Sequence, residues 1–345
     1  MTYQRNDSAS GDSGANREDL EREILGEGPS LTVDEVVDRF GSSRELTSRL
    51  WRALGFPDPG ESPAFSEADL LALSNVSKLV ESGALDVETT IKLTRAVGST
   101  MARLADWQVA TLTEHVEALE QSGQGAGSRL DTSIEVLRAA QAPFEHLLLH
   151  AWRRQLAAAV SRVAELGAQD SDLRTMTVTV GFADLVSFTR LSTGIGEGHL
   201  AVIVEGFESV CGDLITARGG RVIKTLGDSV LFVAHEPKIA VDIACDVVGH
   251  IGADPELPDV HVGLATGSVA MRLGDVFGPP VNLASRLTAI ARRNRVICDH
   301  ETAAALREIK GYAVRALTER ELHGFGVITP FAVRQLPAAL GSERY

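Results

Sequence analysis

The sequence predicts two domains of different fold class, an all-α domain in the first half and an α+β domain in the second. Capping residues and apolar spacing at helical period between residues 18 and 167 indicate the first. Runs of β-branched residues that begin at residue 175 and alternate with amphipathic segments indicate the second. The length of 345 residues is enough for about two domains.

Composition narrows the classes of function. Apolar residues make up 44% of the chain and charged residues 23%, which is typical of folded globular proteins. The net charge of −14 disfavours nucleic-acid binding, because phosphates repel an acidic protein that lacks a strong basic patch. The densest basic run, Arg292-Arg293-Asn294-Arg295, is short, and we expect it to be a solvated helix end and loop.

The cysteines and apolar runs indicate a compartment. Cys211, Cys245 and Cys298 show no metal or redox spacing and stand in apolar contexts, which favours a reducing environment. No signal peptide is apparent, and no apolar run approaches the ~18 residues that a membrane span needs. We therefore expect a soluble, cytoplasmic protein with no membrane span and no nucleic-acid partner.

The first domain is predicted helix by helix. Residues 1–17 are polar and should form a disordered tail, and residues 18–168 should form the helical domain with its linker helix. Thr32 and Glu35 match a capping box, and Gly41 should end that helix. Further helices are expected at 44–54, after Ser66, from Asp86 or Thr89 toward 119, and at about 130–166, with a flexible break at 122–128. Pro143 should interrupt or begin the last of these helices.

The second domain, residues 172–336, alternates strands and helices. The expected strands are 175–182, 221–226, 229–234, 260–265, 269–272, 295–298, 312–317 and 329–334, and the expected helices are 197–217, 237–252, 280–291 and 300–307. Gly227-Asp228 should form a two-residue hairpin turn, and Thr266-Gly267-Ser268 a second turn. The order β-α-β-β-α-β predicts an antiparallel sheet with helices on one face, as in ferredoxin-like folds.

Two aspartates suit a metal ion. Asp184 ends an apolar strand, where an unpartnered carboxylate is costly, and Asp228 lies at the hairpin tip. If the two strands are neighbours, both carboxylates meet at one edge of the sheet. Two carboxylates together with substrate phosphates are a usual way to hold Mg²⁺ or Mn²⁺. Taken alone, Asp228 is better explained by ordinary turn chemistry.

A second group suits a nucleotide. Asn282 and Arg286 are four residues apart on a predicted helix and share a face, where Arg286 can bind a phosphate bidentately. A capping Asn and a solvated Arg are the alternative. Lys224 donates hydrogen bonds and Asp275 accepts them, so the two together match the acceptor nitrogen and donor amino group of adenine. That match requires both side chains to face one base.

Residues from about 177 to 334 resemble the catalytic domain of class III nucleotide cyclases. The matching motifs are Phe182-Ala183-Asp184-Leu185-Val186-Ser187-Phe188-Thr189, residues 224–228 and residues 275–286. The resemblance implies an adenylate cyclase that converts ATP to 3′,5′-cyclic AMP and pyrophosphate with two Mg²⁺ or Mn²⁺ ions on Asp184 and Asp228. It implies that Lys224 and Asp275 select adenine, and that Asn282 and Arg286 serve the ribose and the transition state.

The resemblance also implies an assembly. In this family the site lies between two catalytic domains, and this chain carries both halves, so a head-to-tail homodimer with two equivalent sites is expected. One position departs from the family pattern. Many members carry a second triphosphate lysine in a Lys-Gly-x-Gly loop, whereas this chain has His323 before Gly324-Phe325-Gly326. His323 when protonated, or another residue, would then contact the phosphates.

The helical domain resembles the regulatory module that precedes the catalytic domain in some soluble bacterial cyclases. The resemblance implies an inhibitor that responds to a proton or a small-molecule effector. We expect the helix from Pro143 to residue 166 to transmit the state of this domain, because the helix lies directly before the first catalytic strand. Residues 31–56 and 65–79 are also loosely similar to a winged helix-turn-helix of the MerR type. His146 and His150 have metal-compatible spacing but no evident third ligand, so amphipathic-helix histidines are the alternative.

Three other functions stay open at this point. The chain could be a catalytically silent sensor or dimerisation module built on the same fold. It could be a DNA-binding regulator that uses the front helices, against which its acidic balance argues. It could also be a guanylyl cyclase. An assay that supplies ATP and GTP in parallel would distinguish a guanylyl cyclase from an adenylyl cyclase.

Overall fold

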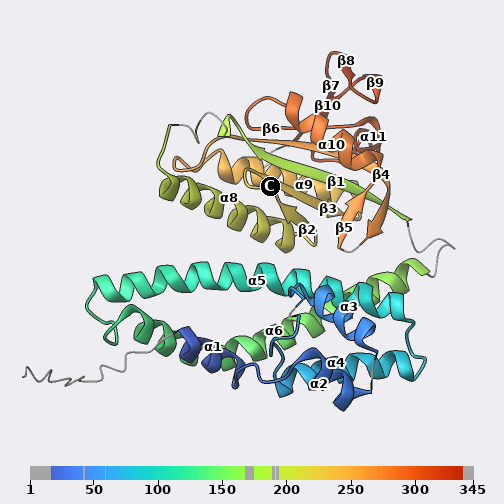
Figure 1. The fold of residues 1–345 in the computed structure, drawn as a ribbon. Coiled ribbons are helices and arrows are strands. Elements are labelled where there is room, and N and C mark those ends of the chain that lie inside the picture. The colour runs from blue at the N-terminus through green and yellow to red at the C-terminus, as the bar shows by residue number, and fades with distance from the viewer. Residues whose placement is uncertain are drawn as a thin grey trace, which may run out of the picture. The chain divides into compact units, whose positions relative to one another are not determined.

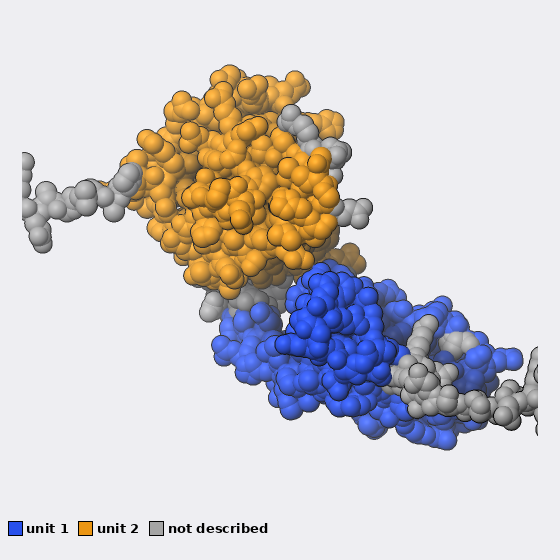
Figure 2. Space-filling model, turned by 90° about the vertical axis from the view of Figure 1, so that its left-hand side faces the viewer, with its two compact units in different colours: residues 1–161 blue, residues 162–345 orange. Residues whose placement is uncertain are grey.

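The computed structural model describes residues 17–41, 43–58, 60–167, 175–188, 191, 194–272 and 274–336. The chain divides into two compact units, residues 1–161 and 162–345, shown in blue and orange in Figure 2. The expected tail lies outside the described residues except for Arg17, and the expected boundary at residues 168–172 also lies outside them. Among the described helices, none is long and apolar enough to cross a membrane.

The first unit is helical, as predicted. Its elements are α1 (Arg17–Leu25), α2 (Val33–Phe40), α3 (Arg44–Leu54), α4 (Glu67–Glu81), α5 (Val87–Gln121) and α6 (Arg129–Gly167). The capping box of Thr32 and Glu35 is present, and Gly41 ends α2 in the left-handed conformation at φ 71°. Asp86, rather than Thr89, caps α5. A small core that includes Leu50, Trp51 and Phe65 holds the short helices together.

The expectation that Pro143 interrupts or begins the last helix is wrong. α6 runs through Pro143 without a break (Figure 1). A proline inside a helix removes one backbone hydrogen bond and costs about 3 kcal/mol. Several turns of helix on each side of Pro143 keep their own hydrogen bonds, and they are enough to continue the helix.

The second unit is a mixed sheet covered by helices (Figure 1). The strands are β1 (Thr175–Leu185), β2 (Arg221–Thr225), β3 (Ser229–Ala234), β4 (Val260–Arg272), β5 (Asp275–Phe277), β6 (Arg295–Cys298), β7 (Tyr312–Ala316), β8 (Arg320–Leu322), β9 (Gly326–Ile328) and β10 (Phe331–Gln335). The helices are α8 (Glu197–Ala217), α9 (Pro237–Ile251), α10 (Pro279–Ile290) and α11 (His300–Leu306). The sheet order is β2-β3-β1-β4-β6-β10-β7, so its first four strands confirm the ferredoxin-like prediction.

The helices cover both faces of this sheet, not one face as expected. α8, α9 and α11 pack against one face through residues such as Phe207, Ile243 and Leu306. α10 packs against the other face, where Ala284 and Leu287 meet apolar side chains of β1, β3 and β4. We call this second face the α10 face. The amphipathic pattern of α10 predicted a buried side but could not say which face of the sheet it covers.

The turn expected at Thr266-Gly267-Ser268 is absent, because β4 is one continuous strand that pairs with β1 over its length. The two glycines of β4 serve close packing instead. A Cβ atom on Gly263 would lie 2.3 Å from the Thr288 backbone nitrogen, and one on Gly267 would lie 2.8 Å from Pro280 Cγ. Both glycines therefore let α10 lie directly on the strand. The Gly227-Asp228 hairpin turn is present, with Gly227 at φ 71°.

A buried carboxylate ties α9 to β7, an edge strand, and to its neighbour β10. Asp242 accepts hydrogen bonds from Lys238 Nζ at 2.7 Å, Gln335 Nε2 at 2.6 Å and the Tyr312 hydroxyl. Burial acts to raise the pKa of Asp242, but the hydrogen bonds from Lys238, Tyr312 and Gln335 outweigh it and lower that pKa. The carboxylate is therefore held ionised inside the fold.

Replacing Asp242 with alanine should lower the free energy of unfolding by about 3 kcal/mol, because it leaves the Tyr312 and Gln335 donors unpaired. Lys238→Ala is the matched control and should cost less than about 1 kcal/mol, since the Lys238 side chain is 45% exposed. Chemical denaturation of both variants measures the difference. Because the pKa of Asp242 is lowered in the folded state, the difference in stability between the two variants should shrink as the pH falls below 3.8, the ordinary pKa of an aspartate, and through the lowered folded pKa. Equal losses in the two variants would contradict this role.

Candidate active site

Two aspartates meet at one end of the β1–β3 pair. Asp184, near the end of β1, is the register partner of Ser229 at the start of β3. The Ser229 hydroxyl donates a hydrogen bond to Asp184 Oδ1. Asp228 lies in the hairpin just before Ser229, and its carbonyl oxygen accepts a hydrogen bond from the Leu185 backbone N–H at 3.0 Å. The structure thus brings the two predicted metal ligands together.

The electrostatics of these aspartates suit a cation. Burial and the nearby charge of Asp184 both raise the pKa of Asp228. Such repulsion between neighbouring carboxylates falls when a divalent cation lies between them. Among the described residues, no group of three or more His, Cys, Asp or Glu side chains forms a metal cage. Two neighbouring carboxylates fit ions that take few protein ligands and complete their shell with phosphates and water.

His261 also belongs to this group, and the sequence analysis did not identify it. Its Nε2 lies 2.9 Å from Asp184 Oδ2, and its Nδ1 lies 3.1 Å from the carbonyl oxygen of Ala291 at the end of α10. Both partners are acceptors, so both ring nitrogens donate when the two bonds are made. Burial alone would lower the pKa of His261, but these bonds outweigh it and raise that pKa. Only the register of β4 against β1 reveals the contact.

The second predicted pair also forms. Lys224 on β2 donates to Asp275 on β5, with Nζ and Oδ2 2.6 Å apart. Both side chains are half-buried, with exposed fractions of 40% and 30%. A bulge between Val222 and Lys224 shifts the register of β2 against β3. A hydrogen-bond donor and an acceptor are thereby presented side by side.

Asn282 and Arg286 lie one turn apart on α10, where Asn282 is exposed and Arg286 is partly buried. The guanidinium of Arg286 lies over the ring of Phe325, 5.8 Å from its centroid. A cation in this position is attracted by the electron-rich ring face. Phe325 occupies the turn between β8 and β9, and the sequence analysis gave it no role. His323 is exposed in the same turn.

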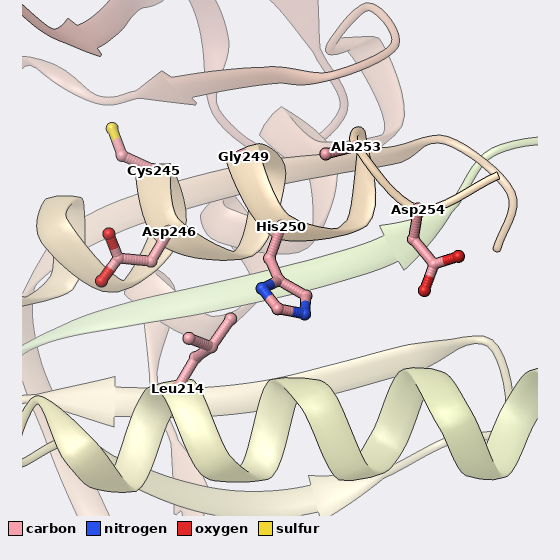
Figure 3. A pocket seen from close by; sticks show the side chains of 7 residues that line it. All are labelled: Leu214, Cys245, Asp246, Gly249, His250, Ala253 and Asp254. Atoms are coloured by element: carbon pink, nitrogen blue, oxygen red, sulfur yellow. The ribbon is translucent and has the colours of Figure 1, made fainter. Parts of the chain in front are cut away.

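The structure does not join the predicted residues into one cluster. In the described part of the chain, no hydrogen bond or ion pair links the Asp184 group to Lys224, Asp275, Asn282 or Arg286. A separate hollow lies between α8 and α9, lined by Leu214, Cys245, Asp246, Gly249, His250, Ala253 and Asp254 (Figure 3). It contains none of the predicted site residues, and Arg218 neutralises its Asp246 at 2.7 Å.

Comparison with known proteins identifies the class. The family model of the adenylate and guanylate cyclase catalytic domain matches residues 172–335. An adenylate cyclase of Streptomyces coelicolor is 38% identical over 338 residues, which span 90% of this chain and 88% of that protein. An adenylate cyclase of Streptomyces griseus is 39% identical over 280 residues, spanning 81% and 69%. A pH-sensitive adenylate cyclase of Mycobacterium tuberculosis is 27% identical over 339 residues, spanning 93% and 82%.

The chain therefore belongs to the adenylate and guanylate cyclase family, which confirms the resemblance found in its motifs.

The Lys224–Asp275 pair makes a testable electrostatic prediction. Burial acts to raise the pKa of Asp275, but the hydrogen bond from Lys224 and that from the Val276 backbone N–H outweigh it and lower that pKa. Lys224→Met should therefore raise the pKa of Asp275, as followed by the carboxyl ¹³C shift in NMR. Arg315→Met, which changes an exposed cation on β7, should leave it unchanged. An unaltered Asp275 titration in Lys224→Met would show that the pair does not form in solution.

Proposed function

We propose that this chain converts ATP to 3′,5′-cyclic AMP and pyrophosphate at two equivalent sites shared by a head-to-tail homodimer. One observation carries the choice of ATP. The Lys224 ammonium and the Asp275 carboxylate lie 2.6 Å apart, and together they offer the donor and acceptor that match the edge of adenine. Guanine would need the reverse arrangement. The adenylate cyclase relatives from Streptomyces support the same substrate.

Asp184 and Asp228 are the proposed ligands of two Mg²⁺ or Mn²⁺ ions. When bound, such ions activate the ribose 3′ hydroxyl as a nucleophile and neutralise phosphate charge. The protein's own residues orient the metal-binding carboxylate of Asp184. Ser229 and His261 each hydrogen-bond one oxygen of the Asp184 carboxylate, which fixes the plane of that group.

Arg286 and Asn282 are the residues proposed to contact the α-phosphate and the ribose of the nucleotide. The Arg286 guanidinium stabilises the negative charge that develops on the α-phosphoryl group as the ribose oxygen attacks it. Asn282, one turn earlier on the same helix, holds the ribose. Phe325 packs against Arg286 and limits the positions that its long side chain can adopt. The reaction needs no protein nucleophile.

The two halves of the site are proposed to meet across the dimer. Asp184 and Asp228 of one chain would face Lys224, Asp275, Asn282 and Arg286 of the other. The match to the adenylate and guanylate cyclase catalytic domain supports this arrangement, because this one chain carries both halves of the site. A monomer would then be inactive.

The helical unit is proposed to regulate the catalytic unit, with a proton or a small molecule as its effector. α6 precedes β1 along the chain, and β1 carries Asp184 near its far end, so a change in α6 would reach the metal site through this strand. His146 and His150 are exposed on α6. The pH-sensitive relative from Mycobacterium tuberculosis supports a proton as the signal.

The activity is tested by supplying ATP and GTP in parallel with Mn²⁺ and measuring both cyclic nucleotides. Cyclic AMP should form, and Asp184→Ala should lower the rate on the order of 100-fold or more, because it removes a metal ligand. Lys238→Ala, which changes a cation on α9 outside the site, should keep the parent rate. Cyclic GMP as the main product would refute the base assignment, and no product from either nucleotide would refute the cyclase.

Regulation is tested by comparing the full chain with a truncated protein that begins near residue 171. The two should differ in specific activity, and the difference should depend on pH, because the truncated protein lacks the helical unit. The dimer content of both proteins is measured in the same experiment, so that a loss of dimerisation is not mistaken for a loss of regulation by the helical unit. Equal activity of both proteins across pH and salt would defeat the proposal.

A further inference from the structure

The second half of α6 exposes an apolar face, whereas its first half is held to α1. Arg138 donates to the two oxygens of the Glu23 carboxylate at 2.9 and 2.8 Å. Gln141 Nε2 donates to the Ile24 carbonyl oxygen at 3.2 Å. Beyond this contact, every residue from 142 to 158 is exposed. Within the described part of one chain, this stretch of α6 is therefore not covered by another element.

The large apolar side chains between residues 148 and 160 lie on one side of the helix. At about 100° per residue they fall within an arc about 120° wide. We call this arc the α6 face, and it consists of Leu148, Leu149, Trp152, Leu156, Ala159 and Val160. Its large side chains are between 40% and 60% exposed. His146, His150 and Arg154 lie outside the arc, so α6 is amphipathic here.

A face of this size needs a partner. Its exposed area comes to roughly 450 Å² per chain, near the upper end of the apolar patches that monomeric proteins leave in contact with water. Most of the stability of a protein helix comes from packing of its apolar side. Pro143 makes this packing more important, because it removes one backbone hydrogen bond just before the face begins.

The spacing of the face identifies a second copy of the chain as that partner. The residues of its central line follow one another at the three-, four- and three-residue intervals of a coiled-coil seam, and they are Leu149, Trp152, Leu156 and Ala159. In a symmetric pair of identical helices each seam residue lies next to its own copy, so a charged seam would repel itself. This seam carries no charge, and Arg153 and Arg154 lie off it.

The area of the face also suits such a pair. Two copies would bury roughly 900 Å² of apolar side chain, close to the ~1,000 Å² expected of a specific interface, before flanking residues are counted. The proposed catalytic homodimer already brings two copies of the chain together, so the α6 pair would extend that interface.

We propose that the α6 faces of two copies of this chain pair as a parallel, in-register coiled coil. The pairing itself is inferred from α6 alone. The parallel direction rests on the proposed function, because two chains that share catalytic sites bring both β1 strands into one assembly. α6 ends at Gly167 and β1 begins at Thr175, and the chain between them spans at most about 28 Å. Parallel helices end at the same point, whereas antiparallel helices would end a helix length apart.

The direct test is cysteine crosslinking of the full-length chain. Leu149→Cys and Leu156→Cys place a thiol in the seam, where the Cα atoms of a residue and its copy lie about 6 Å apart, within the range of a disulfide. Both variants should form covalent dimers under mild oxidation with a copper catalyst, as measured by gel electrophoresis without reductant. Arg154→Cys is the matched control on the opposite side of α6 and should stay at the level of the parent. The parent sets the background, since its three cysteines are buried or partly buried.

The affinity of the dimer gives an independent readout. Trp152→Glu/Leu156→Glu puts like charges next to their own copies and should raise the dimer dissociation constant about 10- to 100-fold, as measured by sedimentation over a range of protein concentrations. The matched control is Leu71→Glu/Leu79→Glu, which makes the same change at two exposed leucines of α4 and should match the parent. The cysteine variants keep the test valid if the glutamate variant fails to fold, because they add no charge.

Two results would overturn the inference. One is the absence of crosslinks at both seam positions together with a parent-like dimer affinity of the glutamate variant. That result would mean that the α6 face has another partner, such as the catalytic unit of the same chain. The other is crosslinking that appears only when Leu149→Cys and Leu156→Cys chains are mixed, which would mean that the helices are antiparallel.

Crosslinking needs neither nucleotide nor turnover, so its failure is distinguishable from a failure of the proposed function. A protein that makes no cyclic AMP, but crosslinks at the seam, would keep the helix pair and remove the cyclase. A protein that makes cyclic AMP without seam crosslinks would keep the cyclase and remove the helix pair.

Discussion

The unbroken antiparallel pairing of β1 with β4 is the constraint on which the site depends. It runs from Thr175–Ala270 to Leu185–Val260 and sets Asp184 beside His261. Gly263 and Gly267 allow α10 to lie directly on β4, and the end of that helix then gives His261 its second hydrogen-bond acceptor at Ala291. A one-residue slip in this register would turn every side chain of β1 to the other face and separate the pair.

The two groups of candidate site residues differ in how their charges are balanced. The Asp184 carboxylate is fixed by Ser229 and His261, while Asp228 nearby has a raised pKa and lacks a cation of its own. Lys224 and Asp275 neutralise each other in this structure. In the proposed function, a metal ion balances the two carboxylates and an adenine ring takes up the donor and acceptor of the Lys224–Asp275 pair.

Features set by neighbours in the sequence were predictable, and features set by tertiary contacts were not. The capping box at Thr32 and the hairpin at Gly227 depend on adjacent residues, and both were predicted. The motif residues could be named because their spacing matches a known family. His261 and Phe325 could not be identified, because only strand register and the placement of the β8–β9 turn give them partners. The turn predicted at Gly267 was wrong for the same reason. The role of this glycine is to allow contact with Pro280, which is distant in the sequence.

The most direct test of the account is whether two inactive chains restore each other. Asp184→Ala removes the metal side of the site, and Arg286→Ala removes the transition-state side. If each site takes one side from each chain, mixing equal amounts should return about a quarter of the parent activity, because half of the dimers then contain one intact site. Subunit exchange is confirmed by energy transfer between labelled chains. No recovery despite exchange would contradict a site shared between two chains.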